Sequence, residues 1–286
     1  MKKKTKKLIC VLLCAVLIFL LAVPGTVKGE KQLFAVAHRG FSGSAPENTL
    51  AAFRLAGEAG YSGCEFDIRL TKDKVWVVMH DDSVDRTTNG SGNVSELTYA
   101  ELSAFTVDGG NRLEKYPEEK IPTLTEALDV CREYSLAPVV EIKGGESGDM
   151  ASLAKILSAR KEKENVVLIS FSEELLEALR RLMPETEMWL LTGTVLPSHI
   201  SFCRKNKIDG ISFAYKNNAS ASIAMVEGAG LKAVSWTVDS AFAARRLAQR
   251  GVAGITTNSL LPQELNVKEN LFGYIWKKVL NPSSNG

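Results

Sequence analysis

The sequence is poor in cysteine and histidine, and this scarcity excludes several kinds of site. Its 286 residues include five cysteines and three histidines. Cys10 and Cys14 lie inside an apolar run near the N-terminus. The other three, Cys64, Cys131 and Cys203, are an odd number without the paired spacing of a zinc site. An exported protein could form one disulfide from them, but scattered thiols of this kind are more often buried small apolar residues, and we expect the latter.

The chain also lacks low-complexity stretches and a strong excess of one charge. Apolar residues make up 45% and charged residues 24%, which excludes a disordered chain, and 22 Gly and 9 Pro are scattered without the period of collagen. The formal net charge of +2 is misleading, because five lysines lie between residues 2 and 7. Without them 30 basic residues (35 − 5) face 33 acidic ones. This mildly acidic remainder argues against nucleic acid as a partner.

The first 30 residues have the pattern of an export signal. After the five lysines comes an uninterrupted apolar run of 16 residues, 8–23. A positive end followed by an apolar run keeps the N-terminus in the cytoplasm and sends the following chain across the membrane. Secretory signals have apolar runs of ~7–15 residues and membrane helices of ~17–25, so a cleaved signal and a retained membrane anchor both remain open. Either way, we expect the rest of the chain to work outside the cytoplasm.

No linker rich in Pro, Gly or Ser divides the remaining chain, in which short apolar strands alternate with amphipathic helical segments. Eight predicted strands begin at Leu33, Gly63, Ala137, Val166, Glu187, Gly210, Ala233 and Gly254. Continuous apolar strands are typical of parallel sheets covered on both faces, and eight β/α units over residues 31–265 predict a (β/α)8 TIM barrel. A doubly wound open sheet is the competing fold, but the glycine-rich phosphate turn that usually follows its first strand is missing.

Two segments do not fit this repeat. Residues 81–122 come after the second strand and its extended partner Val75–Met79, and they are too long for a simple loop. We expect them to form a small insertion over the mouth of the barrel. Residues 266–286 are predicted to be a C-terminal tail, which suits either a last helix or a membrane surface. The first helix is expected to span residues 47–58.

Reactive side chains gather where the predicted strands end, which is the face on which these barrels build active sites. Two of the three histidines, His38 and His80, stand at such ends. Glu65 and Asp67 alternate along the second strand and therefore point to the same side. With Glu141 from the neighbouring strand they form a group of carboxylates whose mutual repulsion requires a cation. Three carboxylates suit one hard divalent cation, Ca²⁺ or Mg²⁺, and suit zinc poorly.

Basic side chains accompany this acidic group. Arg39 follows His38 directly, and Lys143 points the same way as Glu141. A divalent cation with Arg and Lys nearby is a place for a phosphate group, and two histidines beside it can serve as general base and general acid. Hydrolysis of a phosphate ester uses all of these groups. The third histidine, His199, is expected in a solvated surface position.

Several short motifs, taken together, resemble those of the glycerophosphodiester phosphodiesterases. They are A-H-R-G at 37–40, A-P-E-N-T at 45–49, E-F-D at 65–67, V-M-H-D at 78–81, E-I-K at 141–143 and S-W-T-V at 235–238. The motifs occur in family order between about residues 33 and 262. The resemblance implies a barrel enzyme that hydrolyses glycerophosphodiesters to sn-glycerol 3-phosphate and an alcohol.

The resemblance also implies roles for the residues at the strand ends. It assigns metal binding to the three carboxylates and proton exchange with the substrate to His38 and His80. Arg39 and Lys143 become phosphate contacts. The attacking oxygen is either water or the 2-hydroxyl of the substrate's own glycerol. We favour the hydroxyl, because an intramolecular attack saves the entropy of fixing a water, and a cyclic glycerol phosphate would then be the intermediate.

Four further positions complete the predicted site. Phe171 and Trp236 correspond to an apolar wall of the pocket, with core packing as an alternative for Phe171. Glu47 corresponds to a partner that supports the site from behind, with a plain charge at a helix start as the alternative. One departure concerns the family's common Asp after the last strand, where this chain has Asn258. Asn258 keeps the shape and loses the charge, so its role is open.

Two other functions compete with this interpretation. Phospholipases of the sphingomyelinase D type share a similar barrel with two histidines and a carboxylate metal site, but they lack the turn seen at residues 46–49. A catalytically idle module that binds glycerophosphate polymers is the second alternative. Inactive relatives usually lose a histidine or a metal ligand, and all five of these residues are present here.

Overall fold

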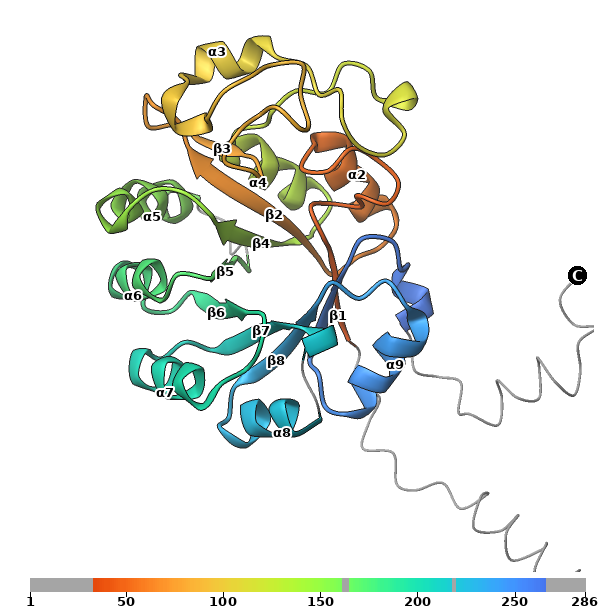
Figure 1. The fold of residues 1–286 in the computed structure, drawn as a ribbon, viewed down its shortest axis with the longest axis vertical. Coiled ribbons are helices and arrows are strands. Elements are labelled where there is room, and N and C mark those ends of the chain that lie inside the picture. Colours follow the sequence, from red (N-terminus) through yellow and green to blue (C-terminus); the bar gives the residue numbers. More distant parts are fainter. Residues whose placement is uncertain (1–32, 161–164, 218–219, 266–286) are drawn as a thin grey trace, which may run out of the picture. The chain divides into compact units, whose positions relative to one another are not determined.

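Eight parallel strands close into a barrel in the computed structural model (Figure 1), which describes residues 33–160, 165–217 and 220–265. They are β1 (Phe34–Ala37), β2 (Gly63–Leu70), β4 (Ala137–Ile142), β5 (Val167–Ser170), β6 (Glu187–Thr192), β7 (Gly210–Ala214), β8 (Lys232–Trp236) and β9 (Gly254–Thr257). Each strand pairs with the next along the chain, apart from the antiparallel hairpin described below, and β1 pairs with both β2 and β9. This closure confirms the predicted (β/α)8 barrel and shows that the open-sheet alternative is wrong.

Helices follow the strands and cover the outside of the barrel (Figure 1). They are α2 (Leu50–Glu58), α4 (Leu124–Glu133), α5 (Met150–Ser158), α6 (Glu173–Leu182), α7 (Pro197–Asn206), α8 (Ser220–Gly228) and α9 (Ala241–Gln249). The first of them begins later than predicted. The Thr49 side chain caps it by accepting a hydrogen bond from the backbone N–H of Ala52, so Glu47 lies in the preceding turn. The interpretation of Glu47 as a charge at the helix start is therefore wrong.

The predicted insertion is present and has a small core of its own. β3 (Trp76–Val78) forms an antiparallel hairpin with β2, and the segment after it contains α3 (Tyr99–Ala104) (Figure 1). This core is a cluster of the buried apolar residues Val77, Met79, Val84, Val94, Leu102 and Ile121. The segment contacts the loop between β1 and α2, where Asn111 Nδ2 donates a hydrogen bond to the Ser42 carbonyl at 2.7 Å. The insertion therefore reaches the rim of the barrel next to the carboxyl end of β1.

Alternation along the strands separates two buried layers. Apolar side chains that point into the barrel, such as Val36, Val139 and Trp189, form one cluster. Those that point outward pack beneath the helices, and among them are Cys64 and Phe66 of β2. Glu65 and Asp67 alternate with Cys64 and Phe66 along β2 and therefore face the interior of the barrel. Cys64, Cys131 and Cys203 are all buried and free, as predicted.

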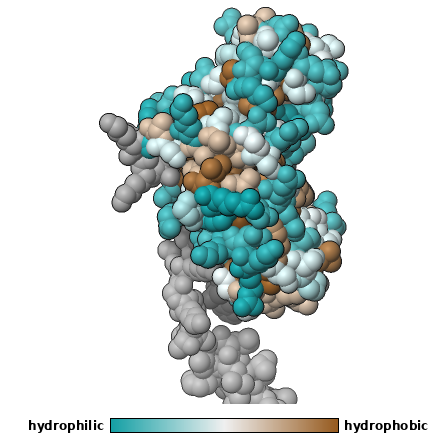
Figure 2. Space-filling model, turned by 90° about the vertical axis from the view of Figure 1, so that its left-hand side faces the viewer, coloured by the Kyte–Doolittle hydropathy of each residue, from teal (hydrophilic) through white to brown (hydrophobic). Residues whose placement is uncertain are grey.

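The described surface offers little extended apolar area. Its exposed large hydrophobic residues are Phe171, Leu182, Leu196 and Phe242. On the face shown in Figure 2, hydrophobic residues form small patches among hydrophilic ones. None of the described helices is both long and apolar enough to cross a membrane. The predicted signal or anchor at 1–30 and the tail at 266–286 lie outside the described residues.

Candidate active site

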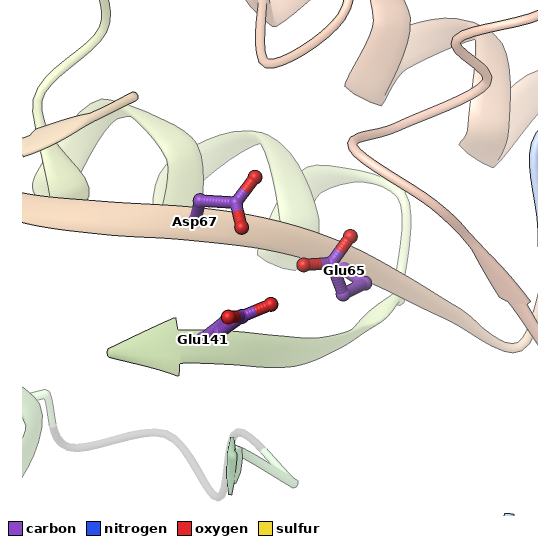
Figure 3. Close-up of side chains that lie close together, drawn as sticks. All are labelled: Glu65, Asp67 and Glu141. Atoms are coloured by element: carbon purple, nitrogen blue, oxygen red, sulfur yellow. The ribbon is translucent and has the colours of Figure 1, made fainter. Parts of the chain in front are cut away.

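Three buried carboxylates meet inside the barrel on β2 and β4 (Figure 3). Glu65 and Asp67 belong to β2, and Glu141 of β4 is in register with Asp67. Each residue offers an oxygen that lies within 4.8 Å of those of the other two. Their exposed fractions are only 2%, 1% and 8%, in the same order as above. The structure thus brings together the three carboxylates that the sequence pattern singles out.

The charges of this acidic triad are incompletely compensated by the protein. Burial and the neighbouring carboxylates raise the pKa of Glu65 well above its ordinary value, and burial and Asp67 raise the pKa of Glu141 to about 7. Lys143 Nζ lies 2.9 Å from Glu141 Oε1 and 3.7 Å from Asp67 Oδ1. Glu65 Oε1 is buried and has no hydrogen-bond partner among the described residues. A donor set made only of oxygens, one of them unpaired, fits a hard divalent cation.

The loop after β1 wraps over the acidic triad. Arg39 and Gly40 both adopt positive φ angles, of 54° and 75°. A Cβ on Gly40 would lie 2.7 Å from the backbone of Ala52, so glycine is required there by both conformation and space. The turn aims the backbone N–H of Arg39 at Glu65 Oε2, at 2.8 Å. This hydrogen bond fixes the carboxylate of Glu65.

The arginine side chain of this loop is held between two carboxylates. Arg39 Nη1 donates to Glu47 Oε1 at 2.8 Å, and its Nε lies 3.5 Å from Asp67 Oδ2. Asn48 Nδ2 also donates to Asp67 Oδ2, at 2.8 Å. Burial alone would raise the pKa of Glu47, but hydrogen bonds and charges of Arg86 and Arg39 lower it below its ordinary value. Glu47 therefore acts as an ionised support that orients Arg39.

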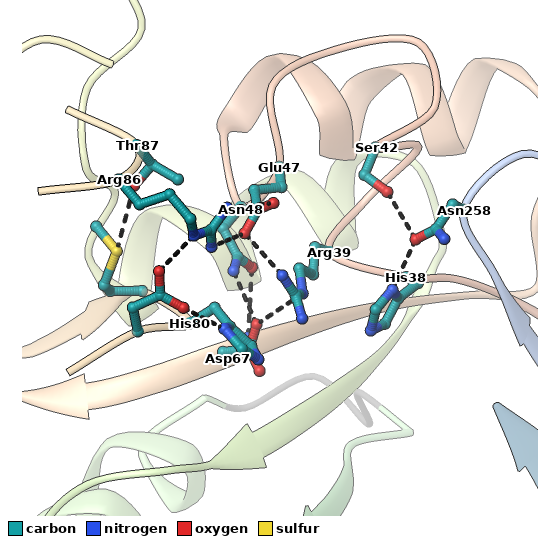
Figure 4. A network of polar contacts seen from close by, with 12 residues as sticks. His38, Arg39, Ser42, Glu47, Asn48, Asp67, His80, Arg86, Thr87 and Asn258 are labelled. Carbon is teal, nitrogen blue, oxygen red and sulfur yellow. Dashed lines mark hydrogen bonds and ion pairs between the residues drawn. The ribbon is translucent and has the colours of Figure 1, made fainter. Parts of the chain in front are cut away.

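His38 is oriented by a neutral amide (Figure 4). Its Nδ1 lies 2.7 Å from Asn258 Oδ1, and Ser42 Oγ donates to the same oxygen at 3.1 Å. An amide oxygen can only accept a hydrogen bond, so Nδ1 of His38 carries the hydrogen. The other ring nitrogen, Nε2, lies 4.0 Å from Glu65 Oε2 and faces the acidic triad. Burial and the charge of Arg39 lower the pKa of His38 below its ordinary value. The ring is thus neutral at neutral pH and presents a lone pair to the site.

His80 is oriented by an ionised carboxylate instead. Its Nδ1 lies 2.6 Å from Asp81 Oδ1, and Arg86 pairs with both Asp81 and Glu47. Hydrogen bonds from Arg86 and from His80 lower the pKa of Asp81 to about 2. The two histidines come from different strand ends, and Arg39 is drawn between them in Figure 4.

Comparison with known proteins agrees with this geometry. The sequence pattern of the glycerophosphoryl diester phosphodiesterase family matches residues 38–261. A glycerophosphodiester phosphodiesterase of Caldanaerobacter subterraneus is 35% identical over 229 residues, which cover 78% of this chain and 93% of the relative. The chain belongs to this family. The predicted class of enzyme, a phosphoric diester hydrolase, is thereby confirmed.

Further relatives of this phosphodiesterase span nearly the same region. A putative glycerophosphodiester phosphodiesterase of Bacillus subtilis is 34% identical over 236 residues, or 79% of this chain and 94% of the relative. Among solved structures, a phosphodiesterase from Oleispira antarctica superposes with a TM-score of 0.75 at 28% identity, covering 81% of this chain and 94% of the other. That protein was determined in complex with the product sn-glycerol-3-phosphate.

The predicted apolar wall of the phosphodiesterase lies at the ends of β5 and β8. The rings of Phe171 and Trp236 meet edge to face, with centroids 5.8 Å apart. Trp236 Nε1 donates to the Ser212 carbonyl at 3.2 Å, which fixes the indole. Because Phe171 is 51% exposed, the alternative that assigns it to the core is wrong. His199 lies in the first turn of α7, where it is half-buried rather than fully solvated as predicted, and its Nδ1 accepts a hydrogen bond from the backbone N–H of Leu196.

Four polar residues of the phosphodiesterase site were missed at the sequence level. They are Asn48, Asp81, Arg86 and Asp239. The first two belong to the motifs at 45–49 and 78–81, so membership of a motif was the available signal. Arg86 lies in the insertion, and nothing in its local sequence points to the site.

Proposed function

We propose that this protein hydrolyses glycerophosphodiesters to sn-glycerol 3-phosphate and an alcohol, with one divalent cation held by Glu65, Asp67 and Glu141. The observation that carries the proposal is the buried acidic triad flanked by two differently oriented histidines. The product named for the Oleispira antarctica relative supports the choice of substrate class. When bound, such a cation supplies a Lewis acid for the phosphoryl oxygens.

The two histidines divide the proton transfers between them. His38, neutral and with Nε2 free, is the general base that takes a proton from the attacking oxygen. His80 is the general acid that protonates the leaving alcohol, because the ionised Asp81 holds its Nδ1 and leaves the other ring nitrogen for the alcohol. Arg39 and Lys143 contact the phosphate. Phe171 and Trp236 border the carbon skeleton of the substrate.

A chelator experiment tests the proposal as a whole. The purified protein, stripped of metal, is assayed on a panel of glycerophosphodiesters and then resupplied with Ca²⁺ or Mg²⁺. Loss of activity on stripping, and recovery with a divalent but not a monovalent salt, is the expected result. Full activity in excess chelator would contradict the metal site. Hydrolysis of sphingomyelin in preference to the panel would favour the sphingomyelinase D type, and binding without turnover would favour the idle module.

A substrate that lacks the glycerol 2-hydroxyl should bind but turn over at least ~100-fold more slowly, the lower end of what one positioned reacting group contributes. We infer that the 2-hydroxyl is the attacking oxygen, because it is already held near the phosphorus. The measurement compares kcat and KM for the normal and the 2-deoxy diester. Trapping of a cyclic glycerol phosphate by rapid quench would support the same route. Equal kcat for both substrates would instead indicate direct attack by water.

Calcium should raise the melting temperature of the metal-free protein more at pH 8 than at pH 6. Without metal, the pKa of Glu141 is raised to about 7 and that of Glu65 well above its ordinary value. A carboxyl whose pKa is raised on folding adds stability at low pH, and this contribution is lost as the pH rises through the folded-state value. At pH 8 more of these carboxyl groups are ionised, and a bound cation compensates their charge. At pH 6 the cation must first displace protons from the carboxyl groups. Equal shifts at both pH values in calorimetry would argue against this site.

We also propose that the enzyme acts outside the cytoplasm, from the lysines and the apolar run of residues 1–30. Fusing these residues to a reporter that is active only after export should give an active reporter. Replacing the five lysines with glutamates in the same fusion provides the control, and it should lower export. If the membrane fraction retains the full-length protein after a high-salt wash, residues 8–23 are an anchor. An inactive wild-type fusion would overturn the assignment.

A further inference from the structure

Asn258, whose role the sequence leaves open, is held by a second residue. Its Nδ2 donates to Asp239 Oδ2 at 2.7 Å, and its backbone N–H donates to Asp239 Oδ1 at 2.7 Å. Thr257 Oγ1 donates to the same Oδ1 at 2.8 Å. The Asp239 carboxylate is exposed to solvent but accepts all three bonds from within the chain. It can only accept, so it forces the amide of Asn258 into one orientation.

We propose that Asp239 is a positioning residue that fixes, through Asn258, the tautomer of His38. With Nδ2 directed at Asp239, the oxygen of Asn258 must face His38 Nδ1, which therefore carries the hydrogen. The lone pair then lies on Nε2, on the side of the acidic triad. This proposal rests on the proposed function, in which His38 is the base.

The neighbourhood of His38 explains why such a constraint matters. Glu65 Oε2 lies 4.0 Å from Nε2, and a carboxylate at that position attracts a hydrogen on the nitrogen that faces it. A hydrogen there would occupy the lone pair that a base needs. The amide of Asn258 can rotate by half a turn and then offer its NH₂ to Nδ1, which would favour this unproductive tautomer. Asp239 prevents the rotation because its carboxylate cannot donate to the amide oxygen.

Exchanges between Asp and Asn, which have the same shape, test the relay, by which we mean the contacts from Asp239 through Asn258 to His38. In Asp239→Asn, the new amide oxygen can accept the backbone N–H of Asn258, but the new NH₂ then faces the Asn258 side chain and turns its amide around. In Asn258→Asp, two carboxylates face each other where a hydrogen bond of 2.7 Å stood. In the double exchange D239N/N258D, the new NH₂ donates to the new carboxylate, whose other oxygen accepts from His38 Nδ1. Asp239→Asn should therefore damage the relay and the double exchange should rebuild it, whereas Asn258→Asp alone still offers His38 Nδ1 only an acceptor and should leave the tautomer unchanged.

The readout is the tautomer itself, followed by kinetics. Nitrogen NMR of the full-length protein labelled at histidine, with Ca²⁺ present, distinguishes hydrogen on Nδ1 from hydrogen on Nε2. Only three histidines contribute signals, and His38→Ala identifies the relevant ones. We expect Asp239→Asn to move the hydrogen to Nε2 and to lower kcat by ~10- to 100-fold, the usual cost of losing such an outer partner, with KM nearly unchanged. The double exchange should restore the Nδ1 hydrogen and most of kcat.

Asp209→Asn is the matched control, because the Asp209 carboxylate also accepts a backbone N–H, that of Met188 at 2.9 Å, but at the start of β7. It should leave the His38 tautomer unchanged. Retention of the Nδ1 hydrogen and of kcat in Asp239→Asn would overturn the proposal, as would a double exchange no better than Asp239→Asn. A tautomer that moves without any loss of kcat would support the relay and refute His38 as the base. If Asp239→Asn does not fold, Asp239→Ala, which removes the acceptor that holds Asn258 Nδ2, decides by the same two readouts.

Discussion

Replacing Glu65 with Gln should lower kcat by at least ~100-fold and weaken binding of the divalent cation by a similar factor, more than the usual loss from an outer partner of a metal ligand. The change keeps the size of the side chain and an oxygen that can accept the backbone N–H of Arg39. It removes one of three buried charges that repel one another. The metal-free variant should therefore be as stable as the wild type or more stable, while its response to calcium is lost.

Opposite effects on activity and on metal-free stability make this experiment specific. A mutation that merely damages the fold would lower both. The matched control is Glu187→Gln on β6, where the carboxylate pairs with Lys232 outside the site. The control should keep wild-type activity and the wild-type calcium shift in melting temperature. If Glu65→Gln keeps half of the activity, or if calcium stabilises it as much as the wild type, the acidic triad is not the metal site.

His38→Ala and His80→Ala should each lower kcat by ~10²–10⁴-fold on a substrate with an alkyl alcohol, the range expected for a positioned acid or base. They should differ when the alcohol is a nitrophenol, which leaves without a proton. We expect His80→Ala to come within ~10-fold of the wild type on that substrate, because only the general acid becomes dispensable. His38→Ala should stay inactive on both substrates.

Release of nitrophenolate reports the first step, so the comparison does not depend on the opening of a cyclic product. Both variants should keep the calcium shift in melting temperature, and His199→Ala, in the first turn of α7, should behave as the wild type. If His38→Ala, and not His80→Ala, recovers activity on the nitrophenyl substrate, then His38 is the acid and His80 the base. If neither variant recovers activity, His80 is not the acid.

The acidic triad could be predicted from the sequence because it depends on short-range rules. Glu65 and Asp67 face one way through the alternation of a single strand, and Glu141 lies opposite Asp67 because neighbouring parallel strands keep their register. The barrel itself follows from the repeated order of strands and helices. These inferences need only the period of each element and the order of the strands.

The orientation of His38 could not be predicted, because it depends on a contact between distant segments, whereas His80 is oriented by its neighbour Asp81. Arg86 lies five residues after Asp81 but reaches Glu47 only through the packing of the insertion against the β1–α2 loop. Asp239 follows the motif at 235–238 directly, but its role appears only when Asn258 of the β9 loop lies beside it. The exposure of Phe171 is likewise a property of the assembled rim.

The hydrogen bond between His38 and Asn258 joins residues that are 220 positions apart in the sequence, and this separation affects when the site can form during synthesis of the chain. β1 is among the first described segments to leave the ribosome, and β9 is the last of the strands. A nascent chain that ends before Gly254 already contains the acidic triad, but β1 has no β9 to pair with and His38 has no Asn258. Contacts this distant in sequence form late in folding. We therefore expect a chain that ends before Gly254 to lack hydrolytic activity, although it carries Glu65, Asp67 and Glu141.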